Sequence, residues 1–337
     1  MAQALPQYQS GAPAVLNDSA ILDLTQAQGV VAQLSSQKLS NVYGCPIAVK
    51  EIRFFAQTWP ISGVVQEGVA PFDFGSIIQA FVSVNNVNLM QNPIFIRSLG
   101  TLLQTNLTYG YQFFNLHGDT GPCYNSTLYR WVFPQPLFIP RNASFDIKIN
   151  AIAKAARPYD PSAVIPTCKV DVAVVGTLQP DLQGMMAPYP YVAEFAPAVS
   201  IRAATGKPAF AMGNDPIFRN VFANPLMLNR LVASLYEGTD YYADLKTDVL
   251  GLYPNVVNTR IWDSKGNNMV GYGGGNAIPL GGLVNPQDGN WFIERTLDQY
   301  EWLNVELYPQ TNADFNTQPI WYPRVAFHGS HMQLFAP

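Results

Sequence analysis

The chain has little charge. Lys, Arg, Asp and Glu make up only 12% of its 337 residues, about half of the ~25% usual in soluble proteins. Its 25 Asn and 21 Gln together outnumber its 19 basic and 23 acidic side chains. An amide surface loses its water more cheaply than a charged one, so the composition favours a protein that packs against copies of itself. A stable secreted β-protein is the alternative interpretation.

A strongly basic region is missing too. The formal net charge is −4, and no run of four Lys or Arg occurs anywhere in the sequence. Proteins that hold nucleic acid through its phosphates need clustered positive charge. We therefore expect no basic tail for genome packaging and no sequence-specific contact with nucleic acid.

Cysteine motifs, a leader and long apolar runs are also absent. Cys45, Cys123 and Cys168 are far apart and form no CxxC pair, which argues against a disulfide framework or zinc module and predicts free buried thiols. Residues 1–6 lack the basic stretch and apolar core of a signal peptide. No run of 18 apolar residues occurs, so we expect no transmembrane helix.

No catalytic or metal-binding motif is complete. His328 and His331 have a spacing that some metal sites use, but they lack a third ligand nearby and the Glu of HExxH. A surface or interface pair is the simpler interpretation. His117 and Asp119 flank a glycine, and no nucleophile motif accompanies them. We predict no catalytic residue, no metal, no cofactor and no enzymatic activity.

Acidic residues and glycines give weaker candidates. Asp240, Asp244 and Asp248 would share one face of a helix and there bind a cation, although a solvated face is the default interpretation. Residues 271–276 are rich in glycine, but they lack the Lys-Ser/Thr of a phosphate loop and predict a flexible surface loop. The carboxylate pairs available to a glycoside hydrolase are Glu294 with Glu301 and Asp298 with Glu306.

The clearest pattern lies between Trp131 and Thr177. An apolar run ends in a Pro-Arg-Asn turn at residues 140–142, and residues 145–149 then alternate between apolar and polar side chains. Such alternation indicates a half-buried strand. After a proline-rich loop, residues 168–176 alternate again. The stretch reads as the last strands of an antiparallel β-sandwich.

The residues that precede this stretch repeat the same signals. From residue 46 onward, short apolar runs are separated by turn residues every ~8–12 positions, as in all-β sandwiches and barrels. Residues 77–84 form one such run and end at the turn pair Asn85-Asn86. About eight strands over ~130 residues fit a jelly roll.

Two segments depart from this pattern. Asn17, Asp18 and Ser19 offer a helix cap, and residues 20–28 fit a short helix. This helix would either pack on its own domain or reach a neighbouring subunit or a membrane surface. Residues 179–216 hold six prolines, which cannot join a central ladder, so we predict a linker or covering segment.

The second half of the chain carries weaker strand signals. Residues 224–236 are a strand pair or a helix, and residues 241–251 fit a helix capped by Asp240. Residues 258–263 read as a strand followed by a turn, and residues 302–307 alternate at period two.

The two halves share one plan. Trp131, the strand 145–149 and a strand that closes at Gly176 correspond to Trp291, the strand 303–307 and a strand that closes at Gly329. The two tryptophans are 160 positions apart, close to half the chain. This recurrence indicates a duplicated unit.

The segment that begins at Phe133, Phe-Pro-Gln-Pro-Leu-Phe-Ile-Pro-Arg-Asn-Ala-Ser-Phe-Asp-Ile-Lys-Ile, resembles phage structural proteins. With two sandwich halves, an N-terminal arm and a proline-rich connector, the whole chain is similar to the double jelly-roll major capsid proteins of tailless icosahedral viruses and phages. The resemblance implies trimers with a pseudo-sixfold outline and strands upright to the capsid surface. It also implies an arm on the inner side and outer towers built from loops such as 118–125 and 271–282.

The predicted organisation is all-β, with two jelly-roll β-sandwiches and a short helical N-terminal arm. The boundaries are an arm at 1–45, a first jelly roll at 46–178, a linker at 179–216 and a second jelly roll at 217–337. The predicted function is that of a self-assembling major capsid protein of the virion, made in the host cytoplasm.

The resemblance also implies partners. These are two further copies in a homotrimer, neighbouring capsomers, vertex or minor capsid proteins and, through the arm, an internal membrane. The alternative functions are a phage vertex, spike or tail-adaptor protein and a carbohydrate-binding β-sandwich protein.

Overall fold

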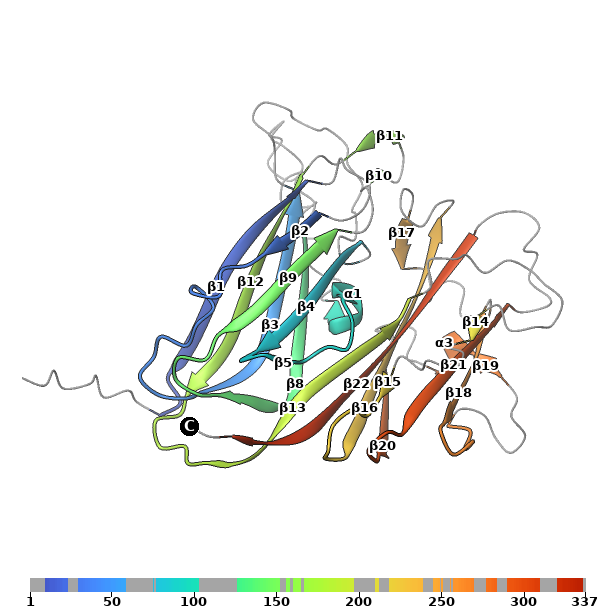
Figure 1. Ribbon diagram of the computed structural model, residues 1–337. Coiled ribbons are helices and arrows are strands. Elements are labelled where there is room, and N and C mark those ends of the chain that lie inside the picture. Colours follow the sequence, from blue (N-terminus) through green and yellow to red (C-terminus); the bar gives the residue numbers. More distant parts are fainter. Residues whose placement is uncertain are drawn as a thin grey trace, which may run out of the picture.

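The structure is a computed structural model. It describes residues 10–23, 30–58, 75, 77–102, 126–151, 156–157, 160–164, 167–196, 210–211, 218–238, 245–248, 250, 255, 257–269, 277–283, 290–309 and 320–335. Strands dominate these residues (Figure 1), which confirms the predicted all-β class. None of the helices in this part of the chain is long and apolar enough to cross a membrane.

Four of the antiparallel sheets lie in two layered pairs, here called the first and the second sheet pair. The strands of the first sheet pair are β1 (Pro13–Asp23), β2 (Val30–Gln33), β3 (Ile47–Thr58), β4 (Ile78–Val84), β5 (Val87–Asn88), β6 (Ile94–Phe95), β7 (Thr101–Leu102), β8 (Ser126–Ile139), β9 (Phe145–Ala151) and β12 (Thr167–Leu178). One sheet has the order β1-β12-β3-β8-β7, and the other has the order β2-β9-β4-β5 with β6 also on β4.

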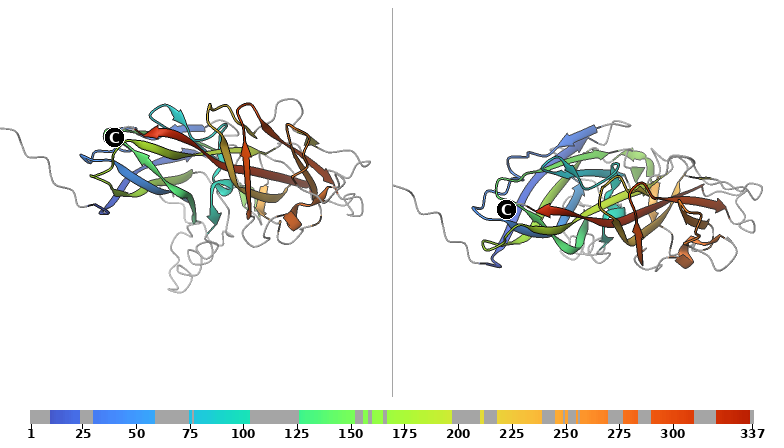
Figure 2. Two further views of the ribbon diagram at one scale, coloured as in Figure 1. Left: turned by 90° about the horizontal axis from the view of Figure 1, so that it is seen from below. Right: turned by 60° about the horizontal axis from the view of Figure 1, so that its bottom comes forward.

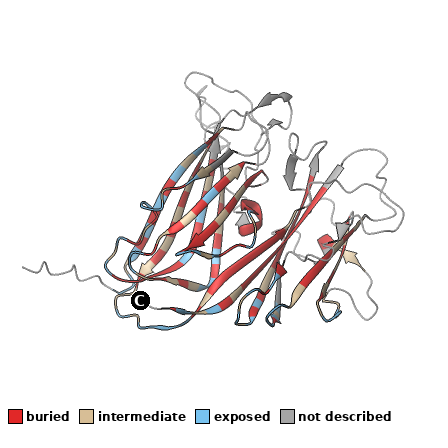
Figure 3. Cartoon of the chain, in the orientation of Figure 1, coloured by how far each residue is buried: buried red, intermediate tan, exposed pale blue. Residues whose placement is uncertain are grey.

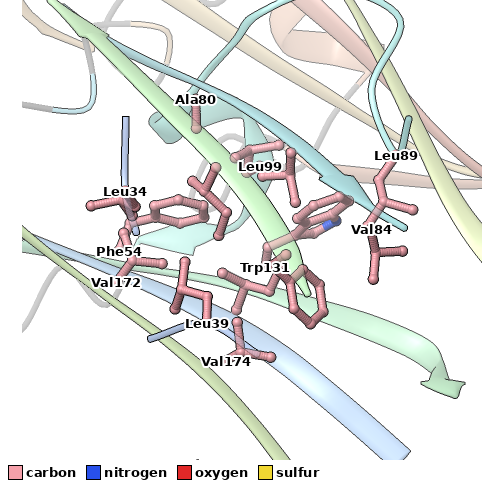
Figure 4. Packing of buried hydrophobic residues seen from close by; sticks show 14 of the residues in the cluster. Leu34, Leu39, Phe54, Ala80, Val84, Leu89, Leu99, Trp131, Val172 and Val174 are labelled. Carbon is pink, nitrogen blue, oxygen red and sulfur yellow. The ribbon is translucent and has the colours of Figure 1, made fainter. Parts of the chain in front are cut away.

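The first sheet pair encloses one apolar core. Along β9, buried side chains alternate with more exposed ones, as predicted for residues 145–149. Phe54, Trp131 and Val172 point into the space between the two sheets (Figure 4). Asn85 and Asn86 both have positive φ, so they form the tight turn predicted after β4. A one-turn helix, α1 (Ile96–Leu99), and a two-stranded ribbon of β10 (Ala156–Arg157) and β11 (Asp160–Val164) complete this half.

The second sheet pair encloses a core of its own. Its strands are β13 (Met185–Phe195), β14 (Phe210–Ala211), β15 (Phe218–Arg219), β16 (Leu226–Gly238), β17 (Leu245–Asp248), β18 (Val257–Asp263), β19 (Ile278–Pro279), β20 (Asn290–Leu297), β21 (Trp302–Pro309) and β22 (Ile320–Phe335), with the one-turn helix α3 (Leu280–Leu283). One sheet has the order β13-β22-β16-β17 with β20 also on β16, and the other has the order β14-β21-β18-β19 with β15 also on β21. Burial is concentrated between the layers of each pair (Figure 3).

The strands follow the same order along the chain and within the sheets in both sheet pairs. Strands β1, β12, β3 and β8 correspond to β13, β22, β16 and β20, and strands β2, β9, β4 and β6 correspond to β15, β21, β18 and β19. Trp131 lies opposite Ile52 in the first pair, and Trp291 lies opposite Leu231 at the matching place in the second. The recurrence seen in the sequence therefore has a counterpart in three dimensions.

The two glycines at which the repeated strands were expected to end lie inside β12 and β22, and one steric constraint explains both. A Cβ on Gly176 would lie 2.4 Å from the carbonyl oxygen of Ala48, and a Cβ on Gly329 would lie 2.6 Å from that of Met227. The strand register shifts beside both contacts. At each place two backbones approach so closely that a side chain has no room.

A buried asparagine fastens the same corner of each sheet pair. Asn41 and Asn220 are both 0% exposed. The side-chain NH2 of each asparagine donates two hydrogen bonds, one to the carbonyl four residues ahead and one to the carbonyl of Pro140 (for Asn41) or Leu297 (for Asn220). The side-chain oxygen of each accepts the N–H two residues ahead. All six distances lie between 2.9 and 3.1 Å. The two corners read Asn-Val-Tyr-Gly-Cys-Pro and Asn-Val-Phe-Ala-Asn-Pro. This second repeat, 179 positions apart, adds to the tryptophan recurrence.

The N-terminal helix predicted for residues 20–28 is wrong where the structure describes it. Residues 20–23 belong to β1, which pairs with β12 along its whole length; residues 24–29 lie outside the described part. Asp18 does not cap a helix, because Lys38 Nζ and the Ser35 N–H bind its carboxylate at 2.7 and 2.8 Å. The first sheet pair thus begins with β1, inside the segment predicted as an arm.

The predicted linker also contributes a strand. Residues 185–195 form β13, although Pro188 and Pro190 lie within it. Because β13 is the edge strand of its sheet and pairs with β22 alone in that sheet, its prolines remove no hydrogen bond from a central ladder. A high number of prolines therefore does not exclude an edge strand.

Several smaller predictions are settled as well. Residues 226–238 form one strand, β16, and residues 245–248 form β17 where a helix was expected. Residues 278–283 form β19 and α3 in place of a loop, while residues 118–125 and 271–276 lie outside the described part. Cys45 and Cys168 are buried free thiols, as predicted; Cys123 is not described.

Candidate functional site

The two sheet pairs meet along β13. The Val192 N–H donates to the Leu89 carbonyl at 3.0 Å, and the Gln91 N–H donates to the Val192 carbonyl at 2.9 Å. Met90 and Val192 form an isolated parallel bridge. Residues 89–91 of the first sheet pair thus bind the side of β13 that faces away from β22.

The backbone and side chain of Glu194 both join this contact. Its backbone exchanges hydrogen bonds of 3.1 and 3.3 Å with the side chain of Asn92. Its carboxylate accepts the Phe95 N–H at 2.8 Å and the Ser98 hydroxyl. The side chain is only 1% exposed. One carboxylate therefore binds both β6 and α1 of the first sheet pair from a strand of the second.

Arg324 of β22 supplies the positive charge beside Glu194. Its guanidinium carbon lies 3.4 Å from the ring centroid of Phe95 and 4.3 Å from that of Tyr236, so two aromatic rings hold the cation in place. Burial raises the pKa of Glu194 to about 7, while Arg324, Ser98 and the Phe95 N–H act in the opposite direction.

His328 bridges the same junction as a neutral side chain. Its Nε2 lies 2.8 Å from the Ser98 carbonyl, and its Nδ1 lies 3.1 Å from Arg230 Nη2. A guanidinium only donates, so Nδ1 accepts and Nε2 carries the proton. Burial, followed by the charge of Arg230, holds the pKa of His328 well below its usual range. Arg230 also donates to the Leu99 carbonyl at 3.0 Å.

Ser98, His328 and Glu194 do not form a hydrolytic relay. In such a relay the histidine takes the proton of the serine hydroxyl. Here the Ser98 hydroxyl donates to Glu194, and His328 binds the Ser98 carbonyl instead. All three side chains are at most 4% exposed. The arrangement fixes the two sheet pairs to each other and presents no nucleophile to a substrate.

A cavity of about 730 Å³ opens beside this network. It is lined by Trp131, Val132, Phe133, Pro134, Pro190, Val192, Asn229, Arg230, Glu294, His328 and Gly329. Trp131 is only 2% exposed and packs edge-on against Phe133 at 4.9 Å. Its ring therefore belongs to the core and offers no free face on which a sugar would stack.

The carboxylates proposed for a glycosidase have other partners. Glu301 pairs with Lys265, whose hydrogen bond lowers the pKa of that carboxyl, and Lys265 lies 3.9 Å from Asp298. Glu306 accepts the hydroxyl of Tyr308. These groups serve local ion pairs and hydrogen bonds around β21, and Glu294 lies at the cavity.

The two predicted histidines are buried, so the surface interpretation is wrong. His331 is 2% exposed and stacks on Phe222 at 3.5 Å; burial lowers its pKa to about 4. The described residues contain no cluster of His, Cys, Asp and Glu able to hold a metal ion. His117, Asp119, Asp240 and Asp244 lie outside the described ranges, and Asp248 lies in β17.

The residues that make the junction were missed in the sequence. Glu194 lies in the run Tyr-Val-Ala-Glu-Phe, Arg324 in Trp-Tyr-Pro-Arg-Val, and Ser98 between Ile96 and Leu99. A single charged residue inside an apolar run is a signal, because such residues are rarely buried without a partner. The signal gives no partner, however, and the partners here are about 100 or more positions apart.

Comparison with known proteins adds little to this geometry. No protein-family model matches the sequence, and no curated protein matches it. Among solved structures, a chain of the Sputnik virophage is similar at a TM-score of 0.41 and 10% identity, over 98% of this chain and 87% of that chain. The major capsid protein P2 of bacteriophage PM2 is similar at 0.31 and 10%, over 95% and 98%.

A glycosylasparaginase of Flavobacterium meningosepticum, PNGase F, is similar at a TM-score of 0.36 and 12% identity, over 94% of this chain and 96% of that chain. All three TM-scores are below 0.5. The likeness therefore includes two viruses and an enzyme and does not decide between them, so a function has to be argued from the chain itself.

Proposed function

We propose that this chain is a structural virion protein, a major capsid protein that assembles through trimers into an icosahedral shell. We also propose that each sheet pair is a jelly roll. If the eight main strands of each pair are counted in chain order, one sheet reads 1-8-3-6 and the other 2-7-4-5. This is the arrangement expected of two interlocked Greek keys.

One observation carries the proposal: two sheet pairs of the same strand order are joined in one chain by a buried polar junction. Three such chains around an axis present six similar units, which is a pseudo-sixfold outline. Each unit then meets its neighbours through similar surfaces, so many modest contacts add up over a closed shell. The low charge of the chain suits such contacts, because mostly uncharged polar surfaces are cheaper to bury.

The proposed setting follows from this role. The chain is made in the host cytoplasm and resides in the virion, with neighbouring capsomers and vertex or minor capsid proteins as partners. No enzymatic step is assigned to it. The contact of an N-terminal arm with an internal membrane is limited to residues 1–9, because β1 and β2 belong to the first sheet pair.

The test is the size and assembly of the purified protein. We expect a species of three times 37.1 kDa by light scattering and closed shells by electron microscopy. A monomer that cleaves glycans would contradict the proposal. A trimer that never builds shells, alone or with its virion partners, would instead favour a vertex, spike or tail-adaptor protein.

The arm is tested by deletion of residues 1–9. We expect intact trimers that close few shells, whereas normal shells would show that the arm is dispensable. A longer deletion to residue 40 takes β1 and β2 with it and should unfold the first sheet pair, so it is not a test of the arm.

A further inference from the structure

Matching positions on the corresponding strands β1 and β13 differ in how far their side chains are exposed. Val15 of β1 lies opposite the residue just before Gly176, and Val192 of β13 lies opposite the residue just before Gly329. Val15 and Val192 are therefore counterparts. Val192 is 1% exposed, but Val15 is 48% exposed.

The same contrast holds on both sides of this valine. Pro190 is buried, whereas its counterpart Pro13 is exposed, and Glu194 is buried, whereas its counterpart Asn17 is exposed. Residues 89–95 bind β13 through hydrogen bonds, and β8 of the first sheet pair also packs against it. Among the described strands, β1 pairs only with β12, so the described part of the chain provides no strand along its outer edge.

The covering segment has a counterpart of its own. Residues 94–99 read Ile-Phe-Ile-Arg-Ser-Leu and form β6 and α1; residues 278–283 read Ile-Pro-Leu-Gly-Gly-Leu and form β19 and α3. Ile94 pairs with β4 as Ile278 pairs with β18. Ile94 and Phe95 are 0% exposed, whereas their counterparts Ile278 and Pro279 are partly exposed.

The two uncovered surfaces lie at opposite ends of the molecule. β1 lies at one end in Figure 1, while β19 and α3 lie at the far end beyond β16 and β22. The two views of Figure 2 agree with this placement. Residues 277–281 of a second copy can therefore contact β1 of the first copy, and the two chains then use different surfaces in this contact.

We propose that residues 277–281 of one copy lie against residues 13–17 of the next copy, as residues 93–97 lie against β13 within the chain. The contact is head-to-tail, and such contacts form a closed ring when the rotation between copies permits. This inference rests on the proposed assembly function and supplies its contact. Neither segment contains a charged residue, so the contact would bury apolar and amide groups only.

A charge placed on β1 tests the contact. Val15→Glu would bury a carboxylate without a partner, so we expect the concentration at which trimers dissociate to rise at least tenfold in light scattering. Val42→Glu is the matched control, because Val42 is 76% exposed and its counterpart Val221 is 56% exposed. A position exposed in both sheet pairs should tolerate the charge. Unchanged thermal unfolding of each monomer shows that both variants fold.

A cross-link tests the partner segment independently. Within the chain, Glu194 binds the Phe95 N–H at 2.8 Å, and the counterparts of these residues are Asn17 and Pro279. In a background with Cys123→Ser, a mixture of Asn17→Cys and Pro279→Cys chains should form disulfide dimers on oxidation. The double variant should form covalent trimers. A mixture of Val42→Cys and Pro279→Cys chains should stay unlinked.

The outcomes separate this inference from the function on which it rests. If the wild-type protein is monomeric at every concentration, both are overturned. If wild-type trimers and shells form but neither Val15→Glu nor the cross-link has the expected effect, the proposed contact is overturned while the capsid function stands. Loss of trimers with Val15→Glu, together with the Asn17–Pro279 cross-link, supports the contact.

Discussion

Replacing Glu194 with Gln would remove the one carboxylate that joins β13 to β6 and α1. The Phe95 N–H and the Ser98 hydroxyl donate to different oxygens of the carboxylate. In glutamine, which has nearly the same size, Oε1 can accept the Phe95 N–H while Nε2 donates to the Ser98 hydroxyl oxygen. The variant lacks the charge and the titration, and its hydrogen bond with Ser98 runs in the opposite direction. The substitution therefore tests the electrostatics of the junction and leaves its packing in place.

The magnitude follows from the raised pKa. Burial moves the pKa of Glu194 from 4.5 to about 7, and each pKa unit corresponds to about 1.4 kcal/mol. Between these two pH values the folded chain keeps a proton that the unfolded chain has lost. The free energy of unfolding therefore falls as pH rises from 4.5 to 7, by about 3 kcal/mol in total, and this contribution is constant above pH 7.

The buried histidines act in the opposite direction. His328 and His331 have lowered pKa values, so they stay neutral in the folded chain while the unfolded chain takes up protons below about pH 6.5. They destabilise the fold as pH falls. The wild-type profile alone thus mixes both effects, and only the difference between wild type and Glu194→Gln isolates the carboxyl.

The assay is urea denaturation at several pH values between 4.5 and 8. We expect the free energy of unfolding of wild type minus that of Glu194→Gln to decrease by about 3 kcal/mol between pH 4.5 and 7. Glu294→Gln is the control, because Glu294 is exposed and its substitution should leave the profile unchanged. A flat difference curve would show that Glu194 is ionised throughout and that Arg324 outweighs burial.

Two further predictions use the repeated features. Asn41→Ala and Asn220→Ala each leave buried backbone groups without a partner and should each lower the free energy of unfolding by about 2–4 kcal/mol in urea denaturation, whereas Gln37→Ala, at an exposed position close to the first corner, should change it by less than about 0.5 kcal/mol. Gly176→Ala and Gly329→Ala should each lower it by about 1–3 kcal/mol or more, because the added Cβ meets a carbonyl oxygen. Melting temperatures equal to wild type for either glycine variant would contradict the close approach.

Much of the fold could be predicted because its signals are local. Alternation along residues 145–149 and the turn at Asn85-Asn86 need only neighbouring residues to be understood. The correspondence between Trp131 and Trp291 was visible for the same reason, since the two tryptophans occupy matching strand positions. These features gave the all-β class and the duplicated plan.

The errors arose where distant parts of the chain decide the structure. The spacing of Ile21 and its neighbours fits a helix as well as a strand, and only pairing with β12 makes it a strand. Pro188 and Pro190 are compatible with a strand only because β13 is an edge. The junction of Glu194, Arg324 and Ser98 joins residues about 100 or more positions apart, and no local pattern indicates which partner each has.

Matching positions of β13 and β1 hold Glu194 and Asn17, and this difference has a consequence for the order of assembly. The cover of β13 is tethered in its own chain, so it acts at high effective concentration and is present before any copy meets another. A permanent contact of this kind can hold a buried carboxylate, because the charge is never returned to water. The groups that form a contact between chains must lose their bound water each time two copies meet, and this desolvation costs less free energy for a neutral amide than for a carboxylate. Each chain therefore brings one contact between sheet pairs already formed. In the trimer that we propose, three copies would need to form only three more contacts to close a ring of six sheet pairs.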